Sequence, residues 1–440
     1  MKKFLKITLV AALALLLSSC ESDRSAILKV YNWSDYLDLD LIEEFEQWYE
    51  EQTGEKVKIV YQTFDINETM LAKIEKGHED FDVVCPSDYI IERMLRKDML
   101  LPLNRDFGTT PNYIDNNIAP FITRCFNTID GNGRNANDYA VGFMWGTTGI
   151  LYNVKAVDEA DTHTWGILVN KKYDGQLFLK DAPRDVFAPS LIYLKQDEIN
   201  AGKTTLNELM YDSSDESIAI VEEFLKESKE LIAGWEADFG KEQMAQEKGS
   251  VNLTWSGDAV WAIREAAELG VELAYTVPDE GSTYWFDGWV IPKYAKNIKA
   301  AQYFINFLCM PENAIRNMDV TGYVSCIGSP EVLAAIEDDE YEPVDLTYFF
   351  GPEADSVRTD SVLYPDRSVI ERCTMEHDWG NATAKLLEMW SRVKGDNASG
   401  ITYIIIAAVA AAVVIFIVAE NLRKKHRRTR KPSGKKSSKK

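Results

Sequence analysis

The stretch Val57–Lys97, VKIVYQTFDINETMLAKIEKGHEDFDVVCPSDYIIERMLRK, alternates between strand and helix patterns. A β-branched and aromatic run (57–64) precedes a helix-forming run (68–77), and a second apolar run (81–85) passes through a turn into another helical pattern. This alternation is typical of a mostly parallel sheet wound with helices. In such sheets ligands bind beyond the carboxyl ends of the strands, where each strand gives way to a helix.

The flanking sequence extends this pattern. The apolar residues of 41–49 share one helical face, Gly54 ends that predicted helix, and the Asn-, Gly- and Asp-rich region 104–137 is predicted to be a loop. The run YAVGFMWGTTGILYN (139–153) predicts a long strand that crosses between lobes, and YWFDGWVIP (284–292) begins a return to the first lobe. We therefore expect an α/β fold with residues 27–139 and 286–330 in lobe 1, and 140–285 and 331–395 in lobe 2.

The segment KVYNWSDYLD (29–38) places two large aromatic residues, Trp33 and Tyr36, around Asp35, where a strand is predicted to give way to a helix. A turn requires only small polar residues, and a helix start requires only one capping oxygen. The simpler interpretation is that Ser34 or Asp35 caps the helix and that Trp33 joins the core. The alternative is that these side chains line a ligand site.

Both ends of the chain carry membrane signals. Three lysines precede the apolar run 7–17, which predicts a signal peptide over residues 1–19, and LSSC (17–20) resembles a lipobox with Cys20 as the lipidated residue. The uncharged run 401–419 is long enough to cross a bilayer core of about 30 Å, and the basic tail that follows indicates the cytoplasmic side. We therefore expect an extracytoplasmic body, on the periplasmic face of the bacterial cytoplasmic membrane, held by a lipid and by a C-terminal transmembrane helix.

The composition disfavours several classes of function. The net charge of −22 would repel nucleic acid, and the excess of acid is larger in the body because basic residues are concentrated at the two ends. The five cysteines after Cys20 have no C-x-x-C pair, so buried free thiols are favoured over a disulfide framework, although one bridge stays open. The four histidines are scattered, which gives a metal site little support. No cofactor motif is recognised.

Seven motifs occur in the order and approximate spacing of a known family: VYNWSDY, DFDVVCPSDYI, YAVGFMWGTTGILYN, DAPRDVFAPSLIYL, VNLTWSGDAVWAI, YWFDGWVIP and TGY. Over roughly residues 28–394 the chain resembles the polyamine-binding (spermidine/putrescine) periplasmic solute-binding proteins of ABC transporters. The resemblance implies a two-lobed type II periplasmic-binding-protein fold with the ligand in the cleft between the lobes. It also implies a polyamine ligand, an ABC permease as partner, no catalysis and a monomer.

Carried over motif by motif, the resemblance implies a set of ligand contacts. They are Trp33, Ser34, Asp35, Tyr36, Ser87, Tyr89, Asp185, Trp255, Asp258, Trp285, Asp287, Tyr323 and, by a looser alignment, Glu376. The W-x-G-D pattern at 255–258 is more similar to the putrescine-type members. Ala182 stands where spermidine-type members carry a second acid, so we expect the shorter diamine to bind at least as well as spermidine.

The chemistry of a polyamine requires such a set independently of the family. A flexible alkyl chain with an ammonium every three or four carbons needs separated carboxylates, and aromatic walls between them can face both methylenes and ammoniums. Asp258 and Asp287 are flanked by large apolar residues, so they are expected to matter more than Asp35. A receptor for an amino acid, sugar or metal, or less favourably a two-carboxylate hydrolase, remains the alternative, although no G-x-S-x-G, P-loop or H-E-x-x-H motif is found.

Overall fold

A computed structural model describes residues 24–237 and 239–395, and the strand and helix patterns of the N-terminal region recur in it. Within this part of the chain, β1 (Ile27–Trp33), β2 (Lys58–Phe64) and β3 (Val83–Val84) are parallel neighbours. The helices α2 (Asp40–Thr53), α3 (Asn67–Glu75) and α4 (Asp88–Arg96) follow these strands in turn. Gly54 ends α2 with a φ of 72°, a left-handed backbone that favours glycine. The expected α/β alternation is confirmed.

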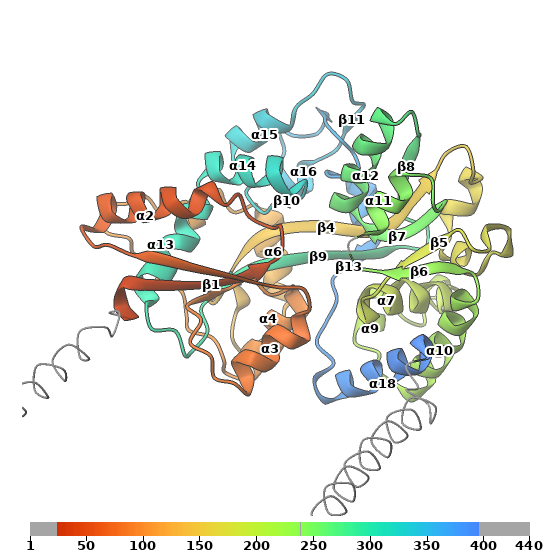
Figure 1. Ribbon diagram of the computed structural model, residues 1–440, viewed down its shortest axis with the longest axis horizontal. Helices are drawn as coiled ribbons and strands as arrows, with labels where there is room; N and C mark the ends of the chain where they lie inside the picture. The colour runs from red at the N-terminus through yellow and green to blue at the C-terminus, as the bar shows by residue number, and fades with distance from the viewer. Residues whose placement is uncertain (1–23, 238, 396–440) are drawn as a thin grey trace, which may run out of the picture.

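Two long strands join the two ends of the molecule. β4 (Ala140–Asn153) pairs antiparallel with β9 (Ser282–Val290), and Figure 1 shows that both extend between the side of β1 and the side of β5 (Leu177–Lys180). The strands lie in the order β2-β1-β3-β9-β4, followed by β7 (Val251–Trp255), β5 and β6 (Ile232–Glu236). The pairs β3–β9, β4–β9 and β4–β7 are antiparallel, so the sheet is mixed rather than mostly parallel. We call the end with β1–β3 lobe 1 and the end with β5–β7 lobe 2.

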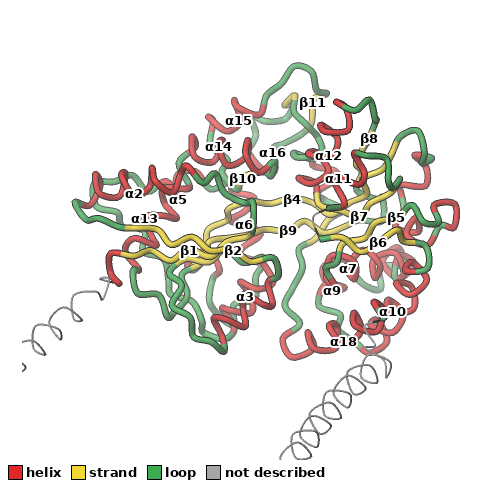
Figure 2. The backbone as a smooth tube through the Cα atoms, viewed as in Figure 1, coloured by secondary structure: helices red, strands yellow, loops and turns green. Residues whose placement is uncertain are grey.

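Lobe 2 repeats the α/β arrangement. Its strands are β5 (Leu177–Lys180), β6 (Ile232–Glu236), β7 (Val251–Trp255) and β8 (Leu273–Thr276). Its helices are α7 (Pro183–Leu194), α8 (Gln196–Asn200), α9 (Leu206–Met210), α10 (Asp215–Lys229), α11 (Gly240–Ala245), α12 (Ser256–Glu268) and α18 (Thr383–Lys394). Figure 2 shows these helices on both sides of the strands.

The other elements complete lobe 1 and the segments between the lobes. They are α5 (Tyr113–Asn117), α6 (Pro120–Thr128), α13 (Ile298–Leu308), α14 (Pro311–Thr321), β10 (Val324–Ser325), α15 (Pro330–Ile336), β11 (Pro343–Val344), α16 (Thr347–Phe350), β12 (Val357–Arg358), α17 (Arg367–Ile370) and β13 (Cys373–Thr374). The prediction of a loop over 104–137 was wrong in part, because α5 and α6 lie there. Buried residues such as Phe121 and Phe126 anchor α6 in the core.

Separate apolar cores hold the two lobes. In lobe 1 one core contains Phe45 and Phe304, and another contains Phe126 and Phe286. The lobe 2 core includes Leu191, Val221 and Leu253. Residues 344–375, which the sequence assigned to lobe 2, contribute to the core around Phe126, so their packing lies with lobe 1. The exact lobe boundaries stay a prediction.

Candidate ligand-binding site

Asp287 lies on β9 in the middle of the crossing strands and is only 6% exposed. The Tyr36 hydroxyl donates to its Oδ2 at 2.9 Å, and the Ser87 hydroxyl donates to its Oδ1 at 2.7 Å. An isolated β-bridge between Ser87 and Asp287 fixes this approach. Three sequence motifs that are far apart in the chain therefore meet at one carboxylate.

The start of α3 and the turn before α4 extend this wall. The Asn67 side-chain amide donates to the Ser87 hydroxyl at 2.9 Å and to the Tyr89 hydroxyl at 3.2 Å. The Tyr89 hydroxyl in turn donates to Glu68 Oε1 at 3.3 Å. These contacts hold Ser87 and Tyr89 in fixed positions at the carboxyl end of β3, where the sheet rule places a ligand.

Lobe 2 contributes Asp185 from the first turn of α7 and Trp255 from the end of β7. The Trp255 indole Nε1 donates to Asp185 Oδ1 at 2.7 Å. The aromatic rings then continue toward lobe 1 by edge contacts, Trp255 to Trp285 at 6.4 Å, Trp285 to Tyr323 at 5.6 Å and Tyr323 to Tyr36 at 5.4 Å between centroids. A row of four aromatic side chains thus joins the surroundings of Asp185 to those of Asp287.

Burial, and after it the repulsion between neighbouring carboxylates, raises the pKa values of the acidic groups at the site. Burial, followed by the negative charge of Asp185, raises the pKa of Asp287 to about 6 even though the Ser87 and Tyr36 hydrogen bonds lower it. Burial, followed by the charge of Asp185, raises the pKa of Glu376 to about 8. Burial also raises the pKa of Asp185 itself. Among the described residues, neither Asp185 nor Asp287 forms an ion pair with a lysine or arginine.

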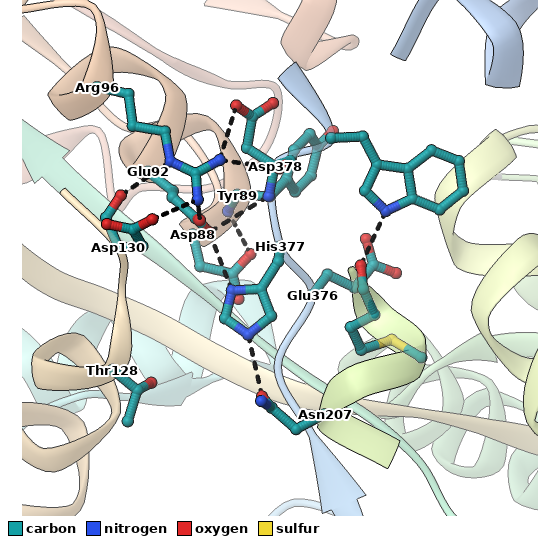
Figure 3. Close-up of polar contacts among 12 residues, drawn as sticks. Asp88, Tyr89, Glu92, Arg96, Thr128, Asp130, Asn207, Glu376, His377 and Asp378 are labelled. Carbon is teal, nitrogen blue, oxygen red and sulfur yellow. Dashed lines mark hydrogen bonds and ion pairs between the residues drawn. The ribbon is translucent and has the colours of Figure 1, made fainter. Parts of the chain in front are cut away.

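Glu376 lies on a segment that runs from β13 to α18 between the lobes. The neighbouring His377 Nδ1 contacts Glu92 of α4 at 3.0 Å, and its Nε2 contacts Asn207 of α9 at 3.1 Å (Figure 3). Arg184 donates to the His377 carbonyl oxygen at 2.7 Å, and its guanidinium lies 3.9 Å from Glu376 Oε2. Contacts to both lobes therefore hold the backbone that carries Glu376, which gives the loosely aligned residue a defined place.

Asp258, in the first turn of α12, has a different environment. Lys180 Nζ lies 2.7 Å from its Oδ2, Lys241 Nζ lies 3.4 Å from its Oδ1, and the Tyr323 hydroxyl donates to Oδ1 at 2.9 Å. Burial alone would raise the pKa of Asp258, but the two lysines lower it below the ordinary value. Its role as an ammonium ligand stays a prediction, and these two lysines weigh against it.

Gly257 explains one feature of the WSGD motif. A Cβ atom at this position would lie 2.4 Å from the ring of Tyr323, which is closer than side chains tolerate. The glycine therefore allows the α12 backbone to approach Tyr323 closely enough for the tyrosine hydroxyl to reach the adjacent Asp258. This glycine is required by packing across the site rather than by turn geometry.

Two residues of the WSDY motif (33–36) are at least partly buried, and the other two are exposed to solvent. Trp33 is partly buried with its ring 4.6 Å from that of Phe64, and Tyr36 is buried, whereas Ser34 and Asp35 are exposed. Asp35 has a left-handed φ of 52°, and α2 begins only at Asp40 without a side-chain cap. The simpler interpretation, that Ser34 or Asp35 caps this helix, was therefore wrong. Ligand contact by these two residues stays a prediction.

Three charged residues at the site were missed in the sequence, namely Lys180, Arg184 and Asp88. Lys180 ends β5 at the same sheet edge as Trp255. Because ligands bind beyond the carboxyl ends of strands, this position could have marked Lys180 as a site residue. Arg184 stands inside the quoted motif DAPRDVF, and Asp88 stands inside CPSDY. The backbone N–H groups of Tyr89 and Phe286 donate to Asp88, which is 1% exposed.

The described residues bear on three further expectations. Cys85, Cys125, Cys309, Cys326 and Cys373 are all free thiols, and the first four are buried. No cluster of histidine, cysteine and acidic residues that could hold a metal ion occurs within residues 24–237 and 239–395. Nor does this part of the chain contain a helix both long and apolar enough to span a membrane. The predicted signal peptide, the predicted lipidation site Cys20 and the predicted span 401–419 lie outside the described residues.

Comparison with known proteins gives the family. Residues 40–342 match the family described as bacterial extracellular solute-binding protein. The spermidine/putrescine-binding periplasmic protein of Escherichia coli is 30% identical over 397 residues, which cover 90% of this chain and 99% of that protein. The putrescine-binding periplasmic protein of the same organism is 30% identical over 76% of this chain and 89% of its own length. The chain therefore belongs to the bacterial extracellular solute-binding proteins.

Solved structures agree with this assignment. The spermidine/putrescine ABC transporter substrate-binding protein of Streptococcus pneumoniae has a TM-score of 0.60 and 30% identity, and the match covers 84% of this chain and 98% of that one. A protein of Listeria monocytogenes has a TM-score of 0.66 and 29% identity over 84% of this chain and 99% of its own. These matches confirm the two-lobed fold inferred from the sequence motifs.

Proposed function

We propose that the protein is an extracytoplasmic receptor that binds a polyamine, putrescine or spermidine, and delivers it to an ABC permease without chemical change. The observation that carries the proposal is the pair of carboxylates, Asp185 and Asp287, in an aromatic wall. Each is held by neutral donors only, from Trp255 in one case and from Tyr36 and Ser87 in the other. Such carboxylates are disfavoured in a partly dry wall until a cation arrives.

The aromatic row supplies the second half of the recognition. Trp255, Trp285, Tyr323 and Tyr36 present ring faces and edges between the two carboxylates, which suits methylenes that join two ammoniums. An ammonium against an aromatic face contributes about 0.5 to 2 kcal/mol. The names of the E. coli and S. pneumoniae relatives support the same ligand class. The residues inferred from the motifs are the proposed contact set, apart from Asp258, whose carboxylate faces Lys180 and Lys241.

The proposal extends to the way the receptor is held. A lipid on Cys20 and a span over 401–419 would attach both ends of the body to one bilayer, close to the permease. The periplasmic names of the relatives support the extracytoplasmic side of this arrangement. We propose a monomer, since one chain supplies both walls of the site.

The test is a titration of the full-length protein in detergent with putrescine, spermidine, arginine and glucose by calorimetry. Binding of at least one polyamine, with recovery of the ligand unchanged on overnight incubation, is the expected result. Tight binding of arginine or glucose without binding of either polyamine would refute the proposal. Conversion of the ligand to a product would refute the absence of turnover.

A further inference from the structure

The ammonium group of Lys180 is fully enclosed at one end of the proposed site. The side chain extends from the last residue of β5, and the residue is 1% exposed. Its Nζ lies 2.7 Å from Asp258 Oδ2, 3.0 Å from Glu236 Oε1 and 3.1 Å from the carbonyl oxygen of Ala237. An ammonium has three N–H donors, so these three oxygens satisfy all of them.

The same ammonium lies against the aromatic row. Lys180 Nζ is 4.0 Å from the centroid of the Trp255 ring, whose Nε1 donates to Asp185. A carboxylate together with an aromatic face is the environment expected for one ammonium of a polyamine. Lys180 therefore makes, from within the protein, the contacts that a ligand amine would make at this end of the site.

The charge balance separates the two parts of the wall. Asp258 and Glu236 face the positive charges of Lys180 and Lys241, so this end is neutral without a ligand. At the other part, Asp185 and Asp287 have no ion-pair partner among the described residues, and Glu376 has only Arg184 at 3.9 Å. A bound cation is therefore needed around Asp185 and Asp287 but not at Asp258.

We propose that Lys180 is a specificity-determining residue, a built-in ammonium that occupies the Trp255–Asp258 end of the site and excludes the additional amine of a longer polyamine. A ligand amine could reach Asp258 only by displacing a buried ammonium from two carboxylates, which would leave that ammonium unpaired. The site then accepts a diamine and disfavours spermidine. This inference rests on the proposed polyamine-binding function and names the ligand within that class.

The test compares the affinities of putrescine and spermidine for the full-length wild type, Lys180→Met and Lys203→Met by calorimetry. Methionine keeps much of the length of Lys180 but removes its charge, which leaves Asp258 and Glu236 for a ligand amine. The ratio of spermidine to putrescine affinity should rise about tenfold or more in Lys180→Met. Lys203→Met is the matched control, because this exposed lysine of lobe 2 lies outside the proposed site, and its ratio should stay within about twofold of the wild type.

A second variant covers the case in which Lys180→Met does not fold. The variant Lys180→Gln also removes the positive charge but keeps a polar side chain beside Asp258 and Glu236, and it should show a rise of the ratio in the same direction. A wild-type crystal structure with putrescine provides a test without substitution, since Lys180 should remain on Asp258. A ligand amine on Asp258 in its place, or an unchanged ratio in the folded variants, would overturn the inference. Absence of polyamine binding by the wild type would instead overturn the proposed function.

Discussion

The Tyr36 hydroxyl donates a 2.9 Å hydrogen bond to Asp287 across 251 residues of sequence. Tyr36 follows the first strand, whereas Asp287 lies on the strand that returns from lobe 2. Together with the Ser87 hydroxyl, this contact fixes both oxygens of the carboxylate. The geometry prepares Asp287 for a cation without supplying one from the described chain.

The first prediction concerns the charge of Asp287. Asp287→Asn keeps the shape of the side chain but removes its charge, so it should weaken putrescine binding roughly ten- to a hundredfold. This range corresponds to the 1.5 to about 3 kcal/mol of a charge-assisted hydrogen bond in a partly desolvated site. Calorimetry of the wild type and the variant measures the change.

Two variants serve as comparisons for Asp287→Asn. Asp35→Asn should have a smaller effect, because Asp35 is exposed and water solvates its carboxylate. Asp355→Asn changes an exposed aspartate outside the proposed contact set and should leave the affinity within about twofold. An affinity of Asp287→Asn within twofold of the wild type would show that the ligand binds elsewhere.

The second prediction concerns the aromatic row. Trp285→Ala removes a ring that contacts both Trp255 and Tyr323. The ligand methylenes then lose one aromatic contact, and the rings of Trp255 and Tyr323 lose the side chain packed between them. We expect weaker binding of putrescine and spermidine by a similar factor, roughly three- to thirtyfold. The ring packs against methylenes, which both ligands have, so its contribution does not depend on the number of amines. A loss confined to one of the two ligands would contradict this role.

The third prediction is a pH dependence of binding. The pKa values are about 6 for Asp287 and about 8 for Glu376. As the pH falls, these carboxylates become protonated in the ligand-free protein, and a cationic ligand must then displace their protons in order to bind. Affinity for putrescine should therefore decrease between pH 8 and 6 and more steeply below pH 6, by up to about tenfold per unit for each group. Glu376→Gln should flatten the upper part of the profile. An affinity that is constant from pH 5 to 8.5 would contradict both assignments.

The same two groups give the stability of the ligand-free protein the opposite trend. Their pKa values are raised in the folded state, so the folded state binds more protons than the unfolded chain above about pH 4. Their contribution to stability is present at low pH and is lost as the pH rises through about 6 and then 8. Thermal unfolding of the wild type and Asp287→Asn across this range should show a shallower loss for the variant.

The sequence predicted local structure better than pairing across the site. A strand over 27–31, which the structure extends to Trp33, and the helix that Gly54 ends follow from periodicity and turn chemistry, which act over a few residues. The antiparallel pairing of β4 with β9 depends on contacts between residues more than a hundred positions apart. Local sequence patterns do not indicate such pairing. For this reason the sequence predicted a mostly parallel sheet, whereas the sheet is mixed.

The candidate site shows the same division. Aspartates at strand ends were identifiable from position and residue type, and Asp287 was marked by its apolar neighbours. The partner of Asp258 was not identifiable from the sequence. Lys180 lies 78 residues away and approaches Asp258 because β5 pairs with β7. Whether a carboxylate faces a ligand or a lysine is decided by the tertiary fold.

The fourth prediction concerns the membrane anchors at the two ends. If Cys20 is lipidated, radiolabelled palmitate should enter the wild-type protein and should not enter Cys20→Ser. If residues 401–419 span the bilayer, a tag after the basic tail should be protected from protease added to intact spheroplasts. Label in Cys20→Ser, or a tail cleaved from outside, would contradict the respective anchor.

The last prediction is that ligand closes the lobes around β4 and β9, with the hinges near 139–153 and 278–285. The Tyr323 hydroxyl donates to Asp258 of α12 at 2.9 Å, and this bond joins the β10 side of the site to lobe 2. A ligand that contacts Asp287 on one wall and Asp185 on the other favours the closed form by its differential affinity for that form. Small-angle scattering should show a smaller radius of gyration at saturating putrescine.

Tyr323→Phe removes one hydrogen bond across the cleft, so it should weaken putrescine binding about three- to tenfold and require more ligand for the same compaction. Unchanged scattering of the wild type at saturation, with binding verified in the same sample, would exclude this hinge motion.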